Sequence, residues 1–339
     1  MKQEIDEIKR TLTHYMKVHY KIIGQQQYNP YLFKDFFAYN LKGNYSFIQE
    51  ELGLKEQINH YAKYRNHLKF EEPEMLMRWH LLSKTSKQCK VYLSMDLEIK
   101  YRGVPTTTYI KNIEHEFVLV KEGTTWKIEE NKYTNPFNII RTEKESRKIE
   151  KAKRSWSFRE KEEIAIPKGI YKREKAIEYA KRYALIPNTK EWKNYESMGG
   201  DCTNFTSQCL FEGGIPFDHQ GKYVTQKWYW YSDHYRTPSF TSANAFKDYA
   251  IGNKGFGLVA KLGDLQTMKI GDIVQLGNLS QTTHSMIVVE IIKDDKNPEV
   301  IKDLLIAQHS GVGGIRGYNI PLSTKPLERL YYNILGYNP

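Results

Sequence analysis

The chain has 339 residues, 40% of them hydrophobic and 27% charged, which excludes a disordered chain and indicates a soluble globular protein with one to three domains. Its net charge of +11 favours anionic partners. Three cysteines without a Cys-x-x-Cys pair argue against a disulfide framework and a structural metal, and no run approaches the roughly 18 apolar residues of a membrane span.

The first third of the chain reads as helices followed by strands. Residues 5–22 place apolar side chains at spacings of three and four, which predicts an amphipathic helix, and a second helix is expected near 53–69. Residues 74–83, 89–101, 109–120 and 125–133 read as strands, with a clean alternation in 89–101. We therefore expect an α+β domain over 1–136, with N-terminal helices packed on a curved antiparallel sheet, an order that resembles the NTF2-like or cystatin-like group.

A charged segment follows at 137–166. Residues 141–163 contain nine Lys or Arg and six Asp or Glu, which predicts a solvated linker. The interspersed acids would weaken any positive patch, so we expect no nucleic-acid partner, while an anionic cell-wall polymer stays open.

The second domain is expected over 167–339. A helix at 173–185 comes first, and the tail reads as strands at 271–276, 284–292 and 303–310. Between them, GGDCTNFTSQCLFEGG (199–214) predicts a helix capped by Asp201 and ended by two glycines. Cys202 would then lie in the first turn, where the helix dipole favours a thiolate, whereas Cys209, two turns on, reads as a core residue.

A thiol nucleophile needs a base and a group that orients the base. His284 opens an apolar strand and His309 ends the next one, so antiparallel pairing would make the two histidines neighbours. Each is also compatible with a histidine that is merely satisfied at a strand end.

Seven motifs over about 170–335 follow one another in an order that resembles the putative amidase domain family of Gram-positive bacteria. They are AIEYAKRYA, GGDCTNFTSQCLFEGG, WYWY, SFTSANAFKDY, GDIVQL, THSMIVVE and AQHS. That family is related to the NlpC/P60 and CHAP cysteine hydrolases. The resemblance implies a papain-like (NlpC/P60-type) α+β catalytic domain with Cys202 as nucleophile, His284 as base and His309 as the polar third member. Gln308 would point away from His309 and is the poorer orienting group.

For the oxyanion, we expect the Cys202 backbone N–H and the Tyr195 hydroxyl, because Glu196 could not donate when ionised. The aromatic residues Trp228, Tyr229, Trp230 and Tyr231 are candidates for substrate binding, with core packing as the alternative.

The sequence thus favours a cysteine amidase or peptidase without metal or cofactor, acting on peptide or peptidoglycan amides. A thiol acyltransferase and a catalytically degenerate module that binds a wall or a partner are the alternatives. The start, MKQEIDEIKR, has no apolar run and is not a signal peptide, so we expect an extracytoplasmic place only if a signal has been removed, and otherwise a cytoplasmic one.

Overall fold

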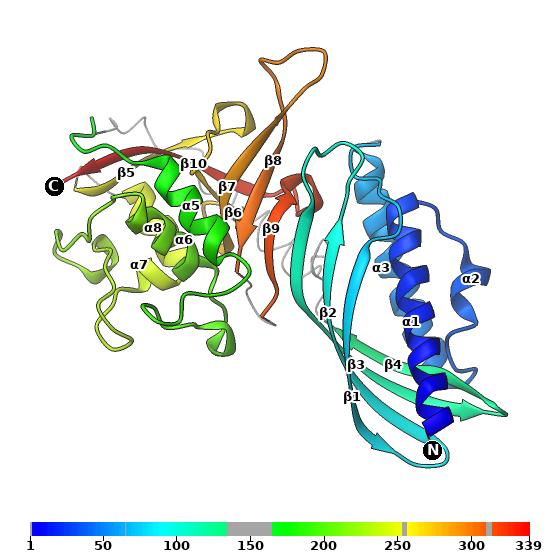
Figure 1. The fold of residues 1–339 in the computed structure, drawn as a ribbon. Helices are drawn as coiled ribbons and strands as arrows, with labels where there is room; N and C mark the ends of the chain where they lie inside the picture. The colour runs from blue at the N-terminus through cyan, green and yellow to red at the C-terminus, as the bar shows by residue number, and fades with distance from the viewer. Residues whose placement is uncertain (1, 65, 134–164, 253–255, 310–313) are drawn as a thin grey trace. The chain divides into compact units, whose positions relative to one another are not determined.

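The computed structural model describes residues 2–64, 66–133, 165–252, 256–309 and 314–339 (Figure 1). These residues form two compact units: one holds the residues up to 133 with 323–325, and the other holds 165–322 and 326–339. Most of the expected linker at 137–166 lies outside the described residues, and the expected domain bounds stay a prediction.

The first unit contains helices α1 (Lys2–Gln25), α2 (Pro30–Lys34) and α3 (Leu41–Ala62). Its strands are β1 (Glu74–Lys84), β2 (Gln88–Ile99), β3 (Thr108–Glu122) and β4 (Thr125–Tyr133), paired antiparallel in that order. The four expected strands are confirmed, and so is the first helix, which is longer than expected. The second helix lies at Leu41–Ala62 rather than near 53–69, because Asn40 caps it by accepting the Gly43 N–H at 2.8 Å.

Helices α1 and α3 cover one face of this sheet (Figure 1). The alternation in β2 turns Leu93, Met95 and Leu97 inward, where all three are buried. The register shifts between Met95 and Leu97 and between Val118 and Leu119, and such bulges bend a sheet. The core of this unit contains buried polar groups beside its aromatic rings.

The second unit begins with α5 (Arg173–Tyr183), a 3₁₀ turn η1 (Glu196–Met198) and α6 (Cys202–Glu212). A turn η2 (Val224–Gln226), α7 (Pro238–Thr241) and α8 (Ala243–Gly252) follow. Its strands are β5 (Gly257–Gly263), β6 (Ile273–Gly277), β7 (Thr282–Lys293), β8 (Ile301–Gln308), β9 (Arg316–Pro321) and β10 (Arg329–Asn338), with the turns η3 (Leu265–Thr267) and η4 (Leu322–Thr324) between them.

These strands lie side by side in the order β9-β8-β7-β6-β10-β5, each antiparallel to its neighbours. The helices gather on one side of the sheet (Figure 1). Helix α6 is buried over its first nine residues, and Thr203 Oγ1 lies 2.9 Å from Ser285 Oγ on β7. The start of α6 is thereby held against the start of β7. In the described part of the chain, no helix is long and apolar enough to cross a membrane.

Candidate active site

Cys202 is the first residue of α6, as the sequence predicts, and only 7% of its surface is exposed. The two preceding glycines, Gly199 and Gly200, have φ angles of 112° and 128°, which side-chain-bearing residues rarely adopt. This glycine loop turns the chain so that α6 begins at the cysteine. The backbone N–H groups of the first helical turn, which have no partner within the helix, therefore lie at the end of α6 that carries Cys202.

The sulfur of Cys202 lies against β7. The backbone N–H of Ser285, the residue after His284, donates a hydrogen bond to the sulfur, and Thr203 Oγ1 lies 3.8 Å from it. The thiol thus sits against the backbone of the strand that carries His284.

The pKa of Cys202 is raised, and the expectation that the helix start lowers it is wrong. Burial raises the pKa of the thiol above its usual value, and the Asp201 carboxylate acts in the same direction, although the hydrogen bonds from Ser285 and Thr203 act against it. The helix start does not outweigh the loss of water. Cys202 therefore rests as a neutral thiol and needs a base to become a nucleophile.

His284, on β7, is half-buried, and its Nε2 lies 3.0 Å from Gln308 Oε1 on β8. Pairing of Ile287 with Ala307 puts the two residues on one face of the sheet, as a diagonal cross-strand pair. An amide oxygen only accepts, so His284 Nε2 carries the proton. The other ring nitrogen, Nδ1, then carries the lone pair that a general base requires.

His309 has different partners from those expected, which corrects its place as the orienting group of His284. Its Nδ1 lies 2.6 Å from Asp201 Oδ2 and its Nε2 lies 2.8 Å from the carbonyl oxygen of Tyr183. Its ring also stacks on Phe205 at 4.1 Å. Both polar partners can accept a hydrogen bond from the ring. His309 and Asp201 form a buried hydrogen-bonded pair beside the start of α6.

Asp201 does not cap α6 with its side chain, contrary to expectation. Besides His309, its carboxylate accepts the backbone N–H of Tyr195 at 2.9 Å and the side-chain amide of Asn204 at 2.8 Å. These bonds fasten the loop before the glycines to the start of α6. Asp201 therefore positions the backbone around Cys202.

Tyr195 and Glu196 are both engaged away from the thiol. The Tyr195 hydroxyl accepts the Trp230 indole N–H at 3.0 Å and donates to Asp233, so the expectation that it donates to an oxyanion is corrected. Glu196 forms a bidentate ion pair with Arg316 at 2.6 and 2.7 Å. Burial raises the pKa of Glu196, but the Arg316 hydrogen bonds and charge outweigh burial and hold that pKa below its usual value.

The four aromatic candidates for substrate binding separate into two kinds. Trp228 is fully buried, and its indole N–H donates to Ser207 at 3.2 Å, so it belongs to the core and the expectation for it is corrected. Trp230 and Tyr231 line an open groove of about 550 Å³ formed by residues 189–194 and 230–233. Tyr229 is half-buried beside them. Sequence reasoning missed Trp192 in this groove, since its single indole carries no motif.

Among the residues that the structure describes, no three His, Cys, Asp or Glu side chains are grouped to hold a metal ion.

Residues 170–324 match the family model described as "Putative amidase domain", which points to amide hydrolysis at the level of that description. Over 98 residues the chain is 33% identical to the uncharacterized protein YjcM of Bacillus subtilis (strain 168), covering 29% of this chain. The chain spans about a fifth of the length of that curated relative, since the match covers 20% of it.

A solved structure titled "Putative Scytalone Dehydratase", from Novosphingobium aromaticivorans, is also similar. It is 12% identical with a TM-score of 0.26, and the match covers 39% of this chain and 85% of that chain.

Proposed function

We propose that the second unit is a cysteine-dependent amide-bond hydrolase, with Cys202 as the nucleophile, His284 as the general base and Gln308 as the residue that orients His284. The observation that carries this proposal is the His284 Nε2 to Gln308 Oε1 hydrogen bond of 3.0 Å, on the strand against which the Cys202 sulfur rests. It fixes the tautomer of His284 and leaves Nδ1 as the base.

The reaction follows from these groups. His284 Nδ1 takes the proton of the Cys202 thiol as the sulfur attacks the amide carbonyl carbon, and the carbonyl oxygen becomes an oxyanion. The Cys202 backbone N–H, at the start of α6, donates to that oxygen. The C–N bond then breaks, His284 gives its proton to the leaving amine, and a thioester remains on Cys202. Water, deprotonated by His284, releases the acid and restores the thiol.

A papain-like arrangement is the fold we propose for this unit. A cysteine at a helix start, then a histidine on a strand, then a polar side chain on the next strand is its order, and Cys202, His284 and Gln308 follow it. The amide of Gln308 would take the place of the Asn that papain uses.

For the substrate, we propose a peptide amide, with peptidoglycan stem peptides as the natural class. Trp230 and Tyr231 offer ring surface for an extended peptide in their groove, and Lys190 and Lys193 on its wall suit a substrate that carries carboxylates. The chain's net charge of +11 would favour the approach of an anionic wall polymer.

The test compares wild type, Cys202→Ala and Cys209→Ala on purified peptidoglycan and a panel of peptide amides, with products identified by mass. Cys209 is fully buried seven residues along the same helix, so it is the matched control. We expect release with wild type and Cys209→Ala and a loss of at least roughly 10³-fold with Cys202→Ala.

Two outcomes would overturn hydrolysis. Release by no protein on any substrate favours the binding module. Faster turnover with an added primary amine, and a product mass that contains that amine, favours the acyltransferase.

A further inference from the structure

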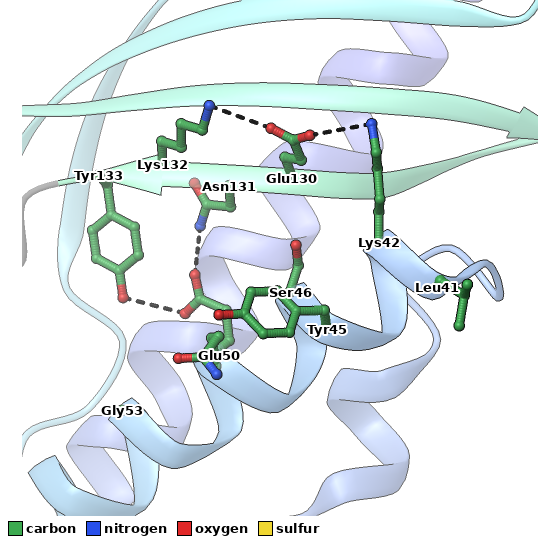
Figure 2. Close-up of a pocket in the computed structure, with 11 residues that line it drawn as sticks. Leu41, Lys42, Tyr45, Ser46, Glu50, Gly53, Glu130, Asn131, Lys132 and Tyr133 are labelled. Atoms are coloured by element: carbon green, nitrogen blue, oxygen red, sulfur yellow. Dashed lines mark hydrogen bonds and ion pairs between the residues drawn. The ribbon is translucent and has the colours of Figure 1, made fainter.

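The first unit contains a groove of its own, between one face of α3 and the last strand, β4 (Figure 2). Its volume is about 770 Å³, which suits a small molecule. Side chains at helical spacing on α3, from Leu41 to Gly53, form one wall, and residues 130–133 form the other. Leu41 and Tyr45 are 89% and 65% exposed, so the groove has apolar walls that are open to solvent.

Glu50 lies at the floor of this groove and is 7% exposed. Its Oε1 accepts the Asn131 amide N–H at 2.8 Å, and its Oε2 accepts the Tyr133 hydroxyl at 3.2 Å (Figure 2). These partners are neutral groups. The carboxyl is thus buried with hydrogen bonds from behind and without a cation among these partners.

The orientation of Asn131 is fixed from deeper in the unit. Its side-chain oxygen lies 3.0 Å from His115 Nδ1, and its amide nitrogen also donates to the Tyr15 hydroxyl at 3.2 Å. The ring of His115 stacks on Tyr133 at 4.5 Å. Because an amide oxygen only accepts, the amide N–H groups of Asn131 must face Glu50 and Tyr15. The floor is therefore built to present a carboxylate toward the groove.

The cations at the rim are already paired. Lys42 and Lys132 lie 3.8 and 3.4 Å from the two oxygens of Glu130 (Figure 2). Both lysines are mostly exposed, so these pairs are weak, but they leave Glu50 as the carboxyl without a positive partner in the groove. A buried carboxylate beside tyrosine rings suits a positively charged ligand, because the cation can pair with the carboxylate and lie against the rings.

We propose that this groove binds a small organic ammonium ion, whose N–H groups donate to Glu50 while its apolar body lies against Tyr45 and Leu41. The occupant is a primary or secondary amine with an apolar substituent. This site is independent of the proposed hydrolase, since both of its walls belong to the first unit.

Protonation of Glu50 ties binding to pH. Burial raises the pKa of Glu50 to about 7, against the lowering effect of the hydrogen bonds from Tyr133, Asn131 and Tyr15. An ammonium ion binds the ionised form, so it competes with the proton. Burial lowers the pKa of His115 to about 4. Burial also raises the pKa of the neighbouring phenols above its usual value; these phenols are Tyr15, Tyr20 and Tyr133. None of these groups therefore titrates between pH 6 and 8.

The test uses the full chain with benzylamine, which is protonated over this range, and benzyl alcohol, its neutral analogue, by calorimetry at pH 6 and pH 8. The ionised fraction of Glu50 rises about tenfold between these pH values, so we expect benzylamine to bind about tenfold more tightly at pH 8, with release of a proton. Benzyl alcohol is expected to bind no more tightly at pH 8. Equal affinity for the two molecules, or benzylamine affinity that does not change with pH, would overturn the proposal.

Glu50→Gln should remove the pH dependence and weaken benzylamine at pH 8 at least tenfold, whereas Glu98→Gln, at an exposed residue of β2 outside the groove, should change affinity less than twofold. If Glu50→Gln does not fold, the carboxyl carbon of Glu50 is followed by NMR in the wild type. Saturating benzylamine is then expected to lower its apparent pKa by at least one unit, and an unchanged pKa would contradict the site.

Discussion

The ring of His284 is held by Gln308 rather than by the next residue, His309, and the bond from Nε2 to Oε1 measures 3.0 Å. Adjacent residues of one strand end thus have separate tasks. Gln308 faces the proposed base, while His309 turns to the opposite side of the sheet and pairs with Asp201 at 2.6 Å.

Gln308→Ala is expected to lower kcat by roughly 10²-fold while KM changes little, since His284 would lose its fixed tautomer and orientation. Steady-state kinetics on the best peptide amide and a thermal melt provide the measurement. Gln308→Asn should restore part of kcat because its amide oxygen can still accept. A loss of folding with no separate loss of kcat would assign Gln308 to structure alone.

His309→Ala is expected to destabilise the second unit by about 1–3 kcal/mol, since it leaves the Asp201 carboxyl buried without its hydrogen-bond partner. Urea unfolding, with tryptophan fluorescence as the signal, measures this free energy. The double variant Asp201→Asn with His309→Ala should recover part of the loss. An unchanged unfolding midpoint combined with a fall in kcat would indicate that His309 acts in the reaction and not in stability.

The thiol of Cys202 should react slowly at neutral pH. Burial raises its pKa, so its rate of alkylation by iodoacetamide should rise with pH through a higher midpoint than that of N-acetylcysteine and be slower than that of N-acetylcysteine at pH 7. Peptide mapping assigns the alkylated residue, with Cys202→Ala as the blank. A midpoint near neutrality would mean that Cys202 and His284 already form an ion pair in the resting protein.

Glu50 should make the first unit less stable as pH rises. Its pKa is raised from 4.5 to about 7, so the native state retains a proton that the unfolded state has lost between these values. Unfolding free energy contributed by this group is highest below pH 4.5 and falls up to about pH 7, by about 3 kcal/mol.

Glu50→Gln should remove this fall, and the difference between wild type and variant isolates it from His19 and His115, whose lowered pKa values act in the opposite direction. Denaturant unfolding at pH 5 and pH 7.5 is the measurement. A difference between wild type and variant that stays constant across pH would contradict the raised pKa.

The local elements could be predicted from the sequence because they depend on spacing along the chain. The alternation in 89–101 predicted β2, and the Asp-Cys pair between glycines predicted the start of α6 at Cys202. The sequence could not predict that Trp228 is buried while Tyr231 is exposed. Neighbouring aromatic residues have similar sequence patterns, and their burial depends on which of them the rest of the fold covers.

The sequence analysis ranked Gln308 below His309 as the group that orients His284, because the face that each residue occupies depends on register. The prediction placed the start of β7 directly opposite the end of β8, which would make His284 and His309 neighbours. The observed pairing of Ile287 with Ala307 moves Gln308 onto the face of His284. A shift of one residue changes the face, and no pattern within one strand records it. The helix dipole likewise gave the wrong direction for the Cys202 pKa, because burial depends on residues far away in the chain.

The most direct measurement of the central claim is the mass of the Cys202 peptide after wild-type protein is mixed with its best amide substrate and quenched in acid within the first turnover. We expect a mass increase equal to the acyl part of the substrate, on Cys202 and not on Cys209, and we expect this increase to disappear on further incubation. Continued turnover by protein in which Cys202 is fully alkylated, with no acyl adduct on that peptide, would contradict it.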